Sequence, residues 1–436
     1  MFKLADKQWE NICERVDTCA LSGAAAFVAS IPKAEILANG PLWCYFYALR
    51  HLEASEHSIA QRFHGSQPDN NAIVYGSEKY ILAALQRLLA KETQPELLLI
   101  ESSCSMSLIG DDLNGIAAKA AVPCPCVTMD CGGLVGGFAE GYVKAQLAVL
   151  EKLVDEAEEA QPNVINIIGQ TDFYLNGRAD SKEIRRLLEL AGYKVQAMPG
   201  SGASIEQLKA LGRASLNVVT QEELGLTVAQ YLEERLGTPY VLAGLPYGVE
   251  GTMSWLRRIA AVMPAANMAF VEEEAQKTQA FLHGQLNDAR CQWGSLWYDR
   301  VIVSAPPTQA LCLAQALRQE WLDTRQLVVC CQRALPSGKQ ELYCQEADSV
   351  YTAGVDKMSL ERMVESGESL LILGSSSENA LLHRLKHTFS SCTIASPVKE
   401  EVLLLEQPFV GITGSRYMLQ RLWKCYIDAC LQKQSE

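Results

Sequence analysis

The sequence predicts an α/β protein built on mostly parallel sheets that are flanked by helices. With 436 residues the chain is too long for one compact core, so two or three domains are expected. Hydrophobic residues make up 48% of the chain, which is enough to fill several cores. From about residue 70 onward, short runs of strand-forming residues alternate with helical patterns, as in βαβ units. Three such sets of elements indicate three Rossmann-like domains.

The first set of predicted elements occupies the N-terminal third of the chain. Residues 72–75 are a predicted strand, and a helix is predicted over residues 77–89. Residues 96–100 are the next predicted strand, followed by a small-residue loop and a helix after Asp111. Asp111 and Asp112 could form a carboxylate pair for acid–base chemistry or metal binding. Their position favours a structural role, because acidic side chains at the start of a helix interact well with its dipole.

The second set begins with a predicted strand at residues 164–169. Helices are predicted over residues 181–190 and 204–211, and each begins at a serine, a residue type that caps helix N-termini well. Residues 194–197 and 216–219 are the accompanying strands. Strand, glycine-bearing turn, helix and strand again is the pattern typical of a parallel sheet.

The third set follows a predicted helix at residues 270–289. Its strands are predicted at residues 300–303, 326–329 and 369–374. A polar stretch at residues 156–163 indicates the first domain boundary, and the second boundary is less marked. The predicted division is an N-terminal α/β domain, a second Rossmann-like domain and a third one with a C-terminal helix, at residues 1–160, 161–292 and 293–436.

The bulk composition argues against several classes of protein. A net charge of −13 gives no electrostatic footprint for nucleic acid or for an anionic membrane. No apolar stretch approaches the roughly 20 residues that span a bilayer. The N-terminus lacks the charged and apolar regions of a signal peptide, so we expect a cytoplasmic protein. The chain has no GxxxxGKS/T phosphate loop, so we do not expect it to be a stand-alone ATPase.

The chain contains 15 cysteines, which in a reducing compartment are thiols or metal ligands rather than a disulfide framework. Most are interpreted as small buried hydrophobes. Cys124 and Cys126, with Cys131 nearby, invite a metal-site interpretation, but Pro125 stiffens the pair and no second pair follows. A structural role is therefore preferred over an auxiliary cluster or sulfur chemistry. The other cysteines interpreted as structural are Cys312, Cys330, Cys331, Cys392, Cys425 and Cys430.

Three glycine- and serine-rich loops lie where a strand or loop meets a predicted helix, at residues 200–202, 374–377 and 411–415. Exposed N–H groups at such places can bind carboxylates or phosphates. Ordinary βα turns are the simpler interpretation of each loop.

Three further cysteines lie in places suited to binding a ligand. Cys44 follows a Gly40-Pro41 turn, which could present it on a rigid loop. Cys104 follows the predicted strand at residues 96–100, and open α/β sheets bind ligands at such carboxyl ends. Cys19 precedes a small-residue stretch that permits close approach. Thiolates are the usual ligands of iron–sulfur clusters, but spacing alone does not join these three.

A series of motifs in fixed order joins them. The motifs are Cys19 with Gly23-Ala24, Gly40-Pro41-x-x-Cys44, Ile73-Val74-Tyr75-Gly76, Ser103-Cys104 with Leu108-Ile109-Gly110-Asp111-Asp112-Leu113, Cys131-Gly132-Gly133-Leu134-Val135-Gly136-Gly137 with Gly141, Asn166-Ile167-Ile168-Gly169, Leu216-Asn217-Val218-Val219 and Gly411-Ile412-Thr413-Gly414-Ser415-Arg416. In order and approximate spacing, these motifs resemble the nitrogenase component 1 and nitrogenase-like oxidoreductase superfamily. That superfamily includes nitrogenase molybdenum–iron protein subunits, cofactor-assembly scaffold subunits and dark-operative protochlorophyllide reductase subunits. The resemblance spans nearly the whole chain.

The resemblance implies a role for the three cysteines. Cys19, Cys44 and Cys104 match the residues that ligate a [4Fe–4S] or larger cluster at the interface with a homologous second subunit. The chain departs from the family where Asn39 replaces a common histidine and Trp43 a common glycine. The source of a fourth ligand stays open, since the partner subunit, an acidic side chain or the substrate could supply it. Pairing of the chain with a second copy of itself also stays open.

The resemblance also implies that no iron–molybdenum cofactor is bound. Gln221 stands where the family places that cofactor's cysteine ligand. The last histidine, His387, comes well before the loop at residues 411–416, near which the histidine ligand is found.

The function implied is that of an oxidoreductase subunit. It would relay electrons from an ATP-dependent P-loop iron protein, through the interfacial cluster, to a reducible small-molecule substrate. A non-catalytic scaffold for assembly of a nitrogenase-type metallocluster is the alternative. A plain α/β protein that binds a small molecule and has structural cysteines is the third possibility.

Overall fold

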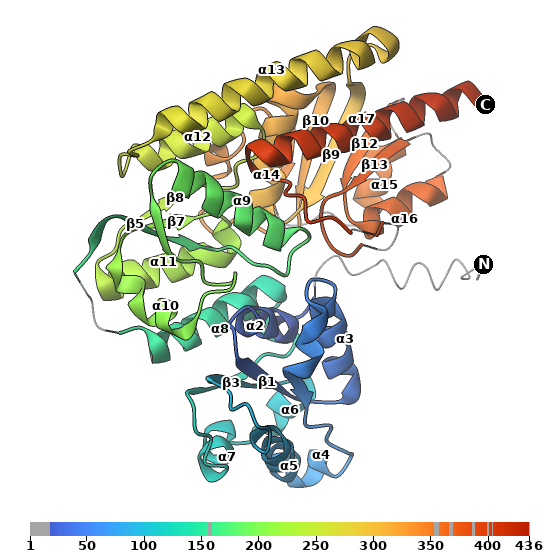
Figure 1. Ribbon diagram of the computed structural model, residues 1–436. Coiled ribbons are helices and arrows are strands. Elements are labelled where there is room, and N and C mark those ends of the chain that lie inside the picture. The colour runs from blue at the N-terminus through green and yellow to red at the C-terminus, as the bar shows by residue number, and fades with distance from the viewer. Residues whose placement is uncertain are drawn as a thin grey trace.

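Three parallel β-sheets organise the chain and confirm the predicted α/β class (Figure 1). The computed structural model describes residues 18–155, 159–352, 357–365, 369–385, 389–398, 401–402 and 404–435. Within these residues, all neighbouring strands of the three sheets run parallel. Parallel strands require crossover helices, which here cover the sheet faces.

The first sheet lies between two pairs of helices. Its strand order is β2 (Phe63–Gly65), β1 (Ala34–Asn39), β3 (Leu97–Ser102) and β4 (Cys126–Asp130). One face packs on α2 (Ala20–Ala29) and α8 (Phe138–Leu153), and the other on α5 (Glu78–Leu89) and α7 (Leu113–Lys119). The predicted strand at residues 96–100 and the two predicted helices are confirmed. Shorter elements of this part are α3 (Leu42–Glu53), η1 (His57–Gln61), α4 (Ala72–Tyr75) and α6 (Cys104–Ile109).

The strand predicted at residues 72–75 is wrong, because this segment is the single helical turn α4. The turn starts where Asp69 accepts a hydrogen bond from the backbone of Asn71 at 2.8 Å. It ends at Gly76, whose positive φ of 80° suits glycine. Of its apolar side chains, Val74 and Tyr75 are 74% and 81% exposed. The apolar run therefore faces outward. Its sequence pattern alone does not distinguish a helical turn on the surface from a buried strand.

The second sheet contains the strands predicted at residues 164–169, 194–197 and 216–219, together with one more. Its order is β6 (Lys194–Ala197), β5 (Gln161–Ile168), β7 (Ala214–Val219) and β8 (Tyr240–Leu242). Ser204 caps α10 as predicted, since its hydroxyl accepts from Gln207 N at 3.3 Å. The helices of this part are α9 (Gly177–Leu190), α10 (Ile205–Lys209), η2 (Ala210–Arg213), α11 (Glu222–Leu236) and α12 (Val249–Ala260).

The predicted start of α9 at Ser181 is wrong. The helix begins at Gly177, after Asn176 in the left-handed conformation with φ 61°. The Ser181 hydroxyl donates to the carbonyl of Gly177 at 2.7 Å, inside the first turns. Serine satisfies its hydroxyl in this way within helices as well as at their caps, so the residue type did not mark the boundary.

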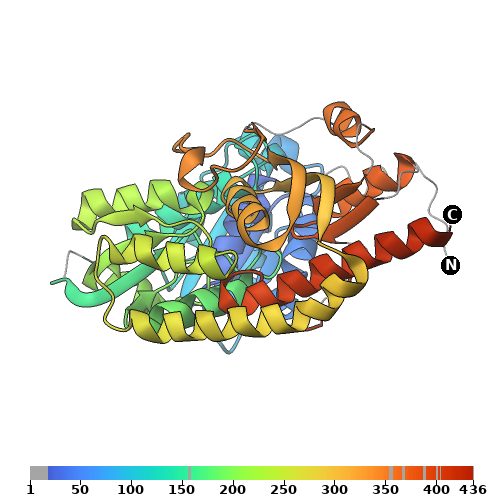
Figure 2. The same cartoon turned by 90° about the horizontal axis from the view of Figure 1, so that it is seen from above.

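The third sheet has five strands, and the three predicted ones form its centre. Its order is β11 (Ser349–Tyr351), β10 (Asp323–Cys331), β9 (Trp297–Ala305), β12 (Leu370–Gly374) and β13 (Phe389–Thr393). The long helices α13 and α17 run side by side, as the view from above shows (Figure 2). The helices of this part are α13 (Met268–Trp293), α14 (Pro307–Ala316), η3 (Leu317–Trp321), η4 (Gln340–Leu342), α15 (Lys357–Glu365), α16 (Ser376–Leu385) and α17 (Gly411–Ser435).

Neighbouring sheets share their hydrophobic cores. One cluster of buried side chains joins Phe27 and Phe138 of the N-terminal part to Leu224 and Leu232 of α11. A second cluster joins the helices of the second sheet to the strands of the third. We retain divisions after residues 160 and 292 as proposed domain boundaries. Part of the polar stretch that suggested the first boundary, residues 156–158, lies outside the described residues.

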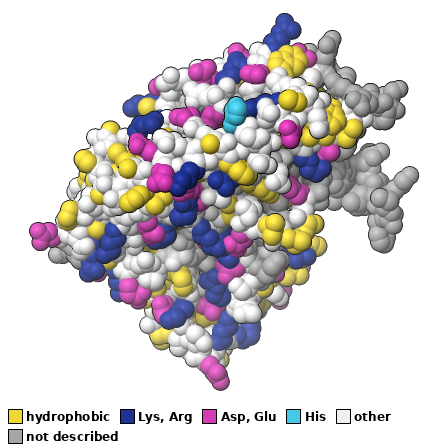
Figure 3. Space-filling view, turned by 45° about the horizontal axis from the view of Figure 1, so that its top comes forward, with side chains coloured by type: hydrophobic (Ala, Val, Ile, Leu, Met, Phe, Trp, Pro, Cys, Tyr) yellow, Lys and Arg dark blue, Asp and Glu magenta, His cyan; other side chains and the backbone are white. Residues whose placement is uncertain are grey.

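The surface mixes charges of both signs. On the face seen in Figure 3, acidic and basic side chains are interspersed, as is usual for a solvated surface. Among the described residues, no helix combines the length and hydrophobicity needed to cross a bilayer.

Candidate functional site

The structure brings Cys19, Cys44 and Cys104 together, each at the N-terminus of a helix. Cys19 is the N-cap of α2, and Cys104 is the first residue of α6. Cys44 lies in the first turn of α3, whose N-cap is Pro41. The Gly-Pro turn is present, but Cys44 lies in a helix rather than on the predicted loop, because proline is well tolerated at the start of a helix. The N–H groups of a helix N-terminus stabilise a thiolate or another anion.

Cys19 and Cys104 lie close enough to Cys44 for their charges to act on it, and we call the region between the three thiols the shared space. Burial raises the pKa of Cys44 above its ordinary value of 9.0, and negative charge on Cys19 and Cys104 raises it further. A hydrogen bond with Ser103 acts in the opposite direction. Repulsion of this kind requires the sulfur atoms to lie close together. Three thiolates here would therefore stabilise a cationic centre that all of them share.

Two glycines allow the loop after β4 to lie directly against the cysteines. The backbone N–H of Gly133 donates to Cys104 Sγ at 2.9 Å. A Cβ at Gly132 would lie 2.5 Å from the backbone nitrogen of Cys104 and 2.7 Å from its Sγ. A Cβ at Gly133 would lie 3.5 Å from Cys19 Cβ and 3.8 Å from Cys104 Sγ. The glycine at position 132 is thus required for this close approach.

The three thiols differ in exposure, and among the described residues they form no site for a single metal ion. Within the described part of the chain, no three His, Cys, Asp or Glu side chains are arranged to hold one metal ion. In an iron–sulfur cluster the thiolates bind different irons, so they can lie further apart. Cys19 is exposed, whereas Cys44 and Cys104 are partly buried, so the shared space opens to the surface. The role of the three residues as ligands remains a prediction.

Ten exposed apolar side chains lie on α3, α4, α6 and the loop after β4, and we call them the apolar surface. Their exposed fractions range from 41% to 81%. Trp43, next to Cys44, is 66% exposed and contacts the rings of Phe46 and Tyr47. Exposed apolar side chains in this number mark an interaction surface. The apolar surface consists of Leu42, Trp43, Phe46, Tyr47, Ile73, Val74, Tyr75, Leu108, Leu134 and Val135.

The other cysteines of the N-terminal part do not join the three. Cys124 and Cys126 pack against the core on the face of the sheet that α5 and α7 cover. Cys131 is fully buried in the core of the opposite face. Burial raises the pKa of Cys126 to about 11. A combined site of these three is therefore absent, in agreement with their predicted structural role.

The predicted structural role of the aspartate pair agrees with the geometry. Asp112 is the N-cap of α7 and accepts from Gly115 N at 3.0 Å. Asp111 instead accepts from the backbone and the hydroxyl of Ser77 at 2.8 and 2.6 Å. Both carboxylates hold helix starts in place.

Sequence reasoning missed one polar group behind the site. Glu101 on β3 is fully buried, and neither of its carboxylate oxygens has a hydrogen-bond partner. Burial raises its pKa well above the ordinary value of 4.5. Its charge also acts on Cys131, which places the two side chains near each other. The polar residue in an otherwise apolar strand was the available signal.

Gln221 is buried at the N-cap of α11, and its side-chain oxygen has no partner. His387 lies outside the described residues. The expectation of no iron–molybdenum cofactor therefore remains a prediction.

Comparisons with known proteins agree with this architecture. A family model described as nitrogenase component 1 type oxidoreductase matches residues 19–425. The chain is 28% identical to a subunit of the light-independent protochlorophyllide reductase of Nostoc punctiforme, over 56% of this chain and 49% of that protein. It is 25% identical to the corresponding subunit of Zygnema circumcarinatum, over 93% and 81%.

Two further matches extend the range of relatives. Identity is 26% to the nitrogenase iron-molybdenum cofactor biosynthesis protein NifE of Clostridium pasteurianum, over 61% of this chain and 56% of that protein. The chain spans about half the length of the curated relatives that it first matches. It covers 49% of the first of these proteins and 56% of the second. The solved structure of nitrogenase Cp1 at pH 6.5 superposes with a TM-score of 0.74 at 17% identity, covering 95% of this chain and 93% of that one. This match supports the fold.

Proposed function

The chain belongs to the nitrogenase component 1 type oxidoreductase family, and we propose that it is a subunit of a nitrogenase-like reductase. In this proposal Cys19, Cys44 and Cys104 ligate an iron–sulfur cluster at a subunit interface. The subunit relays electrons from an ATP-dependent P-loop iron protein to a reducible small molecule. A [4Fe–4S] cluster is the first candidate, and a larger cluster is the second.

One observation carries the proposal: three thiols from three helix N-termini face a shared space beside the apolar surface. The backbone N–H of Gly133 donates a hydrogen bond to Cys104 Sγ at 2.9 Å. Hydrogen bonds to ligating sulfur are one of the means by which a protein tunes such a group. When bound, an iron–sulfur cluster supplies one-electron chemistry.

The apolar surface supports a subunit interface over the cysteines. Three thiolates leave one iron of a [4Fe–4S] cluster without a ligand from this chain. A second subunit that covers Trp43 and Tyr47 could supply that ligand and exclude water. A homologous subunit and a second copy of this chain both meet this requirement. The absence of a phosphate-loop sequence favours a separate iron protein as the site of ATP hydrolysis.

The alternative is a scaffold on which a nitrogenase-type metallocluster is assembled. The match to a cofactor biosynthesis protein favours it, as does the glutamine at position 221. A scaffold releases its cluster once, whereas a reductase turns over. Steady ATP consumption by the iron protein with substrate reduction supports the reductase, and a single transfer of iron to an acceptor protein supports the scaffold.

Anaerobic purification followed by iron and sulfide analysis tests the shared proposal. We expect about four irons or more per cluster site in the wild-type protein. Cys19→Ala and Cys104→Ala should lose most of this iron. Cys124→Ala is the matched control, because this partly buried cysteine lies on the other face of the first sheet. Fewer than about two irons per pair of chains, unchanged by the two substitutions, would exclude the cluster.

A further inference from the structure

A cavity of about 540 Å³ lies between the first and second sheets, away from the cysteines. It is lined from the first sheet's side by Lys33, which precedes β1. Cys44 comes after the opposite end of β1, and a strand of this length spans about 20 Å. The length of β1 therefore separates Lys33 from the cysteines. From the second sheet's side, Asp172 and Ser201 line it after β5 and β6. The carboxyl ends of parallel strands are the usual ligand-binding edge of α/β sheets.

Positive charge dominates the lining of this cavity. Two carboxylates face five cationic side chains. Three of the cations, Arg178, Lys182 and Arg185, come from α9 at spacings of four and three residues, so they share one face of that helix. Arg178 lies in the first turn of this helix, where the helix dipole also favours an anion. The other two cations are Lys33 and Arg62.

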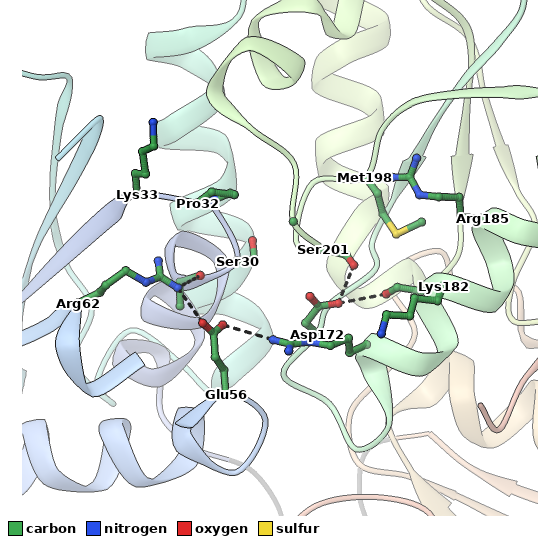
Figure 4. A pocket seen from close by; sticks show the side chains of 14 residues that line it. Ser30, Pro32, Lys33, Glu56, Arg62, Asp172, Lys182, Arg185, Met198 and Ser201 are labelled. Carbon is green, nitrogen blue, oxygen red and sulfur yellow. Dashed lines mark hydrogen bonds and ion pairs between the residues drawn. The ribbon is translucent and has the colours of Figure 1, made fainter. Parts of the chain in front are cut away.

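Both carboxylates of the lining are already engaged. Glu56 accepts from Arg62 at 3.3 Å and from Arg178 at 3.4 Å, one arginine on each oxygen (Figure 4). Asp172 accepts from the hydroxyls of Ser201 at 2.6 Å and Ser181 at 3.3 Å. Burial also raises the pKa of Asp172 above its ordinary value of 3.8. The carboxylates therefore offset only part of the positive charge.

The remaining cations pair with acids that do not line the cavity. Lys33 pairs with Glu96, and Lys182 pairs with Glu406. The side chains of these lysines are 62% and 65% exposed, and ion pairs this exposed to solvent are weak. A ligand with several negative groups can therefore compete for both lysines at low cost.

The loop at residues 200–202 leaves the rim open. Gly202 has a φ of 72°, and no atom lies within 4 Å of the position that a Cβ would take. The Ser201 side chain reaches into the lining beside it. This glycine-rich loop, noted in the sequence for its anion-binding pattern, thus borders a cavity.

We propose that this cavity binds a small molecule that carries at least two carboxylate or phosphate groups. The cations on the two sides of the cavity hold opposite ends of this molecule. The ligand replaces Glu56 on one arginine and bridges the first and second sheets. The proposal is independent of the cysteine site, since it depends on no residue of that site.

Isothermal titration of the purified chain with inorganic pyrophosphate and with succinate tests this proposal, at constant ionic strength set by sodium chloride. We expect saturable binding of at least one anion. Lys182→Gln with Arg185→Gln should weaken it by about tenfold or more, because charge-assisted contacts are lost. Lys277→Gln is the control, because Lys277 forms a similarly exposed ion pair on α13. Binding of only one anion supports the proposal and identifies the ligand as a phosphate or a carboxylate.

Glu56→Gln provides a second test, in which tighter binding is expected. A variant that failed to fold could not give this result. This substitution removes the negative charge that engages Arg62 and Arg178, so we expect either anion to bind several-fold more tightly. Saturation by neither anion in the wild type would overturn the proposal. Equal affinity in the wild type, the double variant and Glu56→Gln would also overturn it.

Discussion

The backbone N–H of Gly133 donates a hydrogen bond to Cys104 Sγ at 2.9 Å, across 29 positions of the sequence. This contact holds the loop after β4 against the first turn of α6. It depends on the neighbouring Gly132, which leaves no room for a side chain beside Cys104. The two glycines therefore have different tolerances, although they are adjacent and both lie beside the cysteines.

Gly132→Ala should disrupt the site, whereas Gly133→Ala should be tolerated. A methyl group at position 132 would lie 2.5 Å from a backbone atom of Cys104, so the loop must move. Overpacking of this kind costs about 1–3 kcal/mol. At position 133 the nearest atom is 3.5 Å away, an ordinary contact. Urea unfolding and iron content measure both effects. Equal iron content in the two variants would show that the loop does not hold the site.

Replacing Trp43 and Tyr47 together by alanine should weaken association with the proposed second subunit. The two rings stack with centroids 6.0 Å apart and are 66% and 61% exposed. A large aromatic side chain at the centre of an interface often contributes about 2 kcal/mol or more, which is about 30-fold in the dissociation constant, so the double variant should lose at least this factor.

Sedimentation of the isolated complex over a dilution series measures this change. Phe270→Ala is the control, because Phe270 is 58% exposed on α13, outside the apolar surface. A dissociation constant that stays the same in the aromatic double variant would mean that the partner binds elsewhere.

The central strands of the third sheet were readily predicted from sequence. Its central strands are buried on both faces, so they read as continuous apolar runs. Strand β1 is equally buried but contains Glu35, which His64 and Lys91 contact at 2.5 and 3.1 Å. Those partners come from distant segments, so the sequence around Glu35 gave no sign that a carboxylate could be accommodated in a strand.

The candidate site was predictable only in part, for a similar reason. Local turns suggested how Cys44 and Cys104 are presented, but their link to Cys19 came from the family resemblance. The three cysteines belong to three separate helices, and no periodicity connects them. The cavity beside α9 was not predicted at all, because its cations range from Lys33 to Arg185 and meet only when two sheets pack together.

Glu101→Gln should stabilise the protein at neutral pH. The pKa of Glu101 is raised well above 4.5 in the folded state. Above pH 4.5 the unfolded chain has released this proton while the folded chain keeps it, so stability falls as pH rises. The loss is about 1.4 kcal/mol per pH unit until the folded pKa is reached. The glutamine variant lacks this dependence.

Urea unfolding of the two proteins at pH 5, 6 and 7 measures the difference in free energy. It should grow with pH in favour of Glu101→Gln. Glu273→Gln serves as the control, because Glu273 is an exposed acid on α13. A difference that is constant across the three pH values would show that Glu101 is ionised in the folded protein.

His51→Phe should make the protein more stable in mild acid. This effect grows as pH falls, whereas the effect of Glu101 grows as pH rises. Burial lowers the pKa of His51 from 6.5 to about 4, and its ring lies against Phe138 with centroids 5.4 Å apart. Below pH 6.5 the unfolded chain binds a proton at this residue that the folded chain excludes. Stability therefore falls as pH drops from 6.5 to about 4, by up to about 3 kcal/mol. Thermal unfolding between pH 4.5 and 7 should show a smaller acid-induced loss in His51→Phe than in the wild type. His283→Phe is the control, because this residue is exposed on α13 and its substitution should leave the acid-induced loss as in the wild type. If His51→Phe lost as much stability in acid as the wild type, other groups would be responsible for the loss.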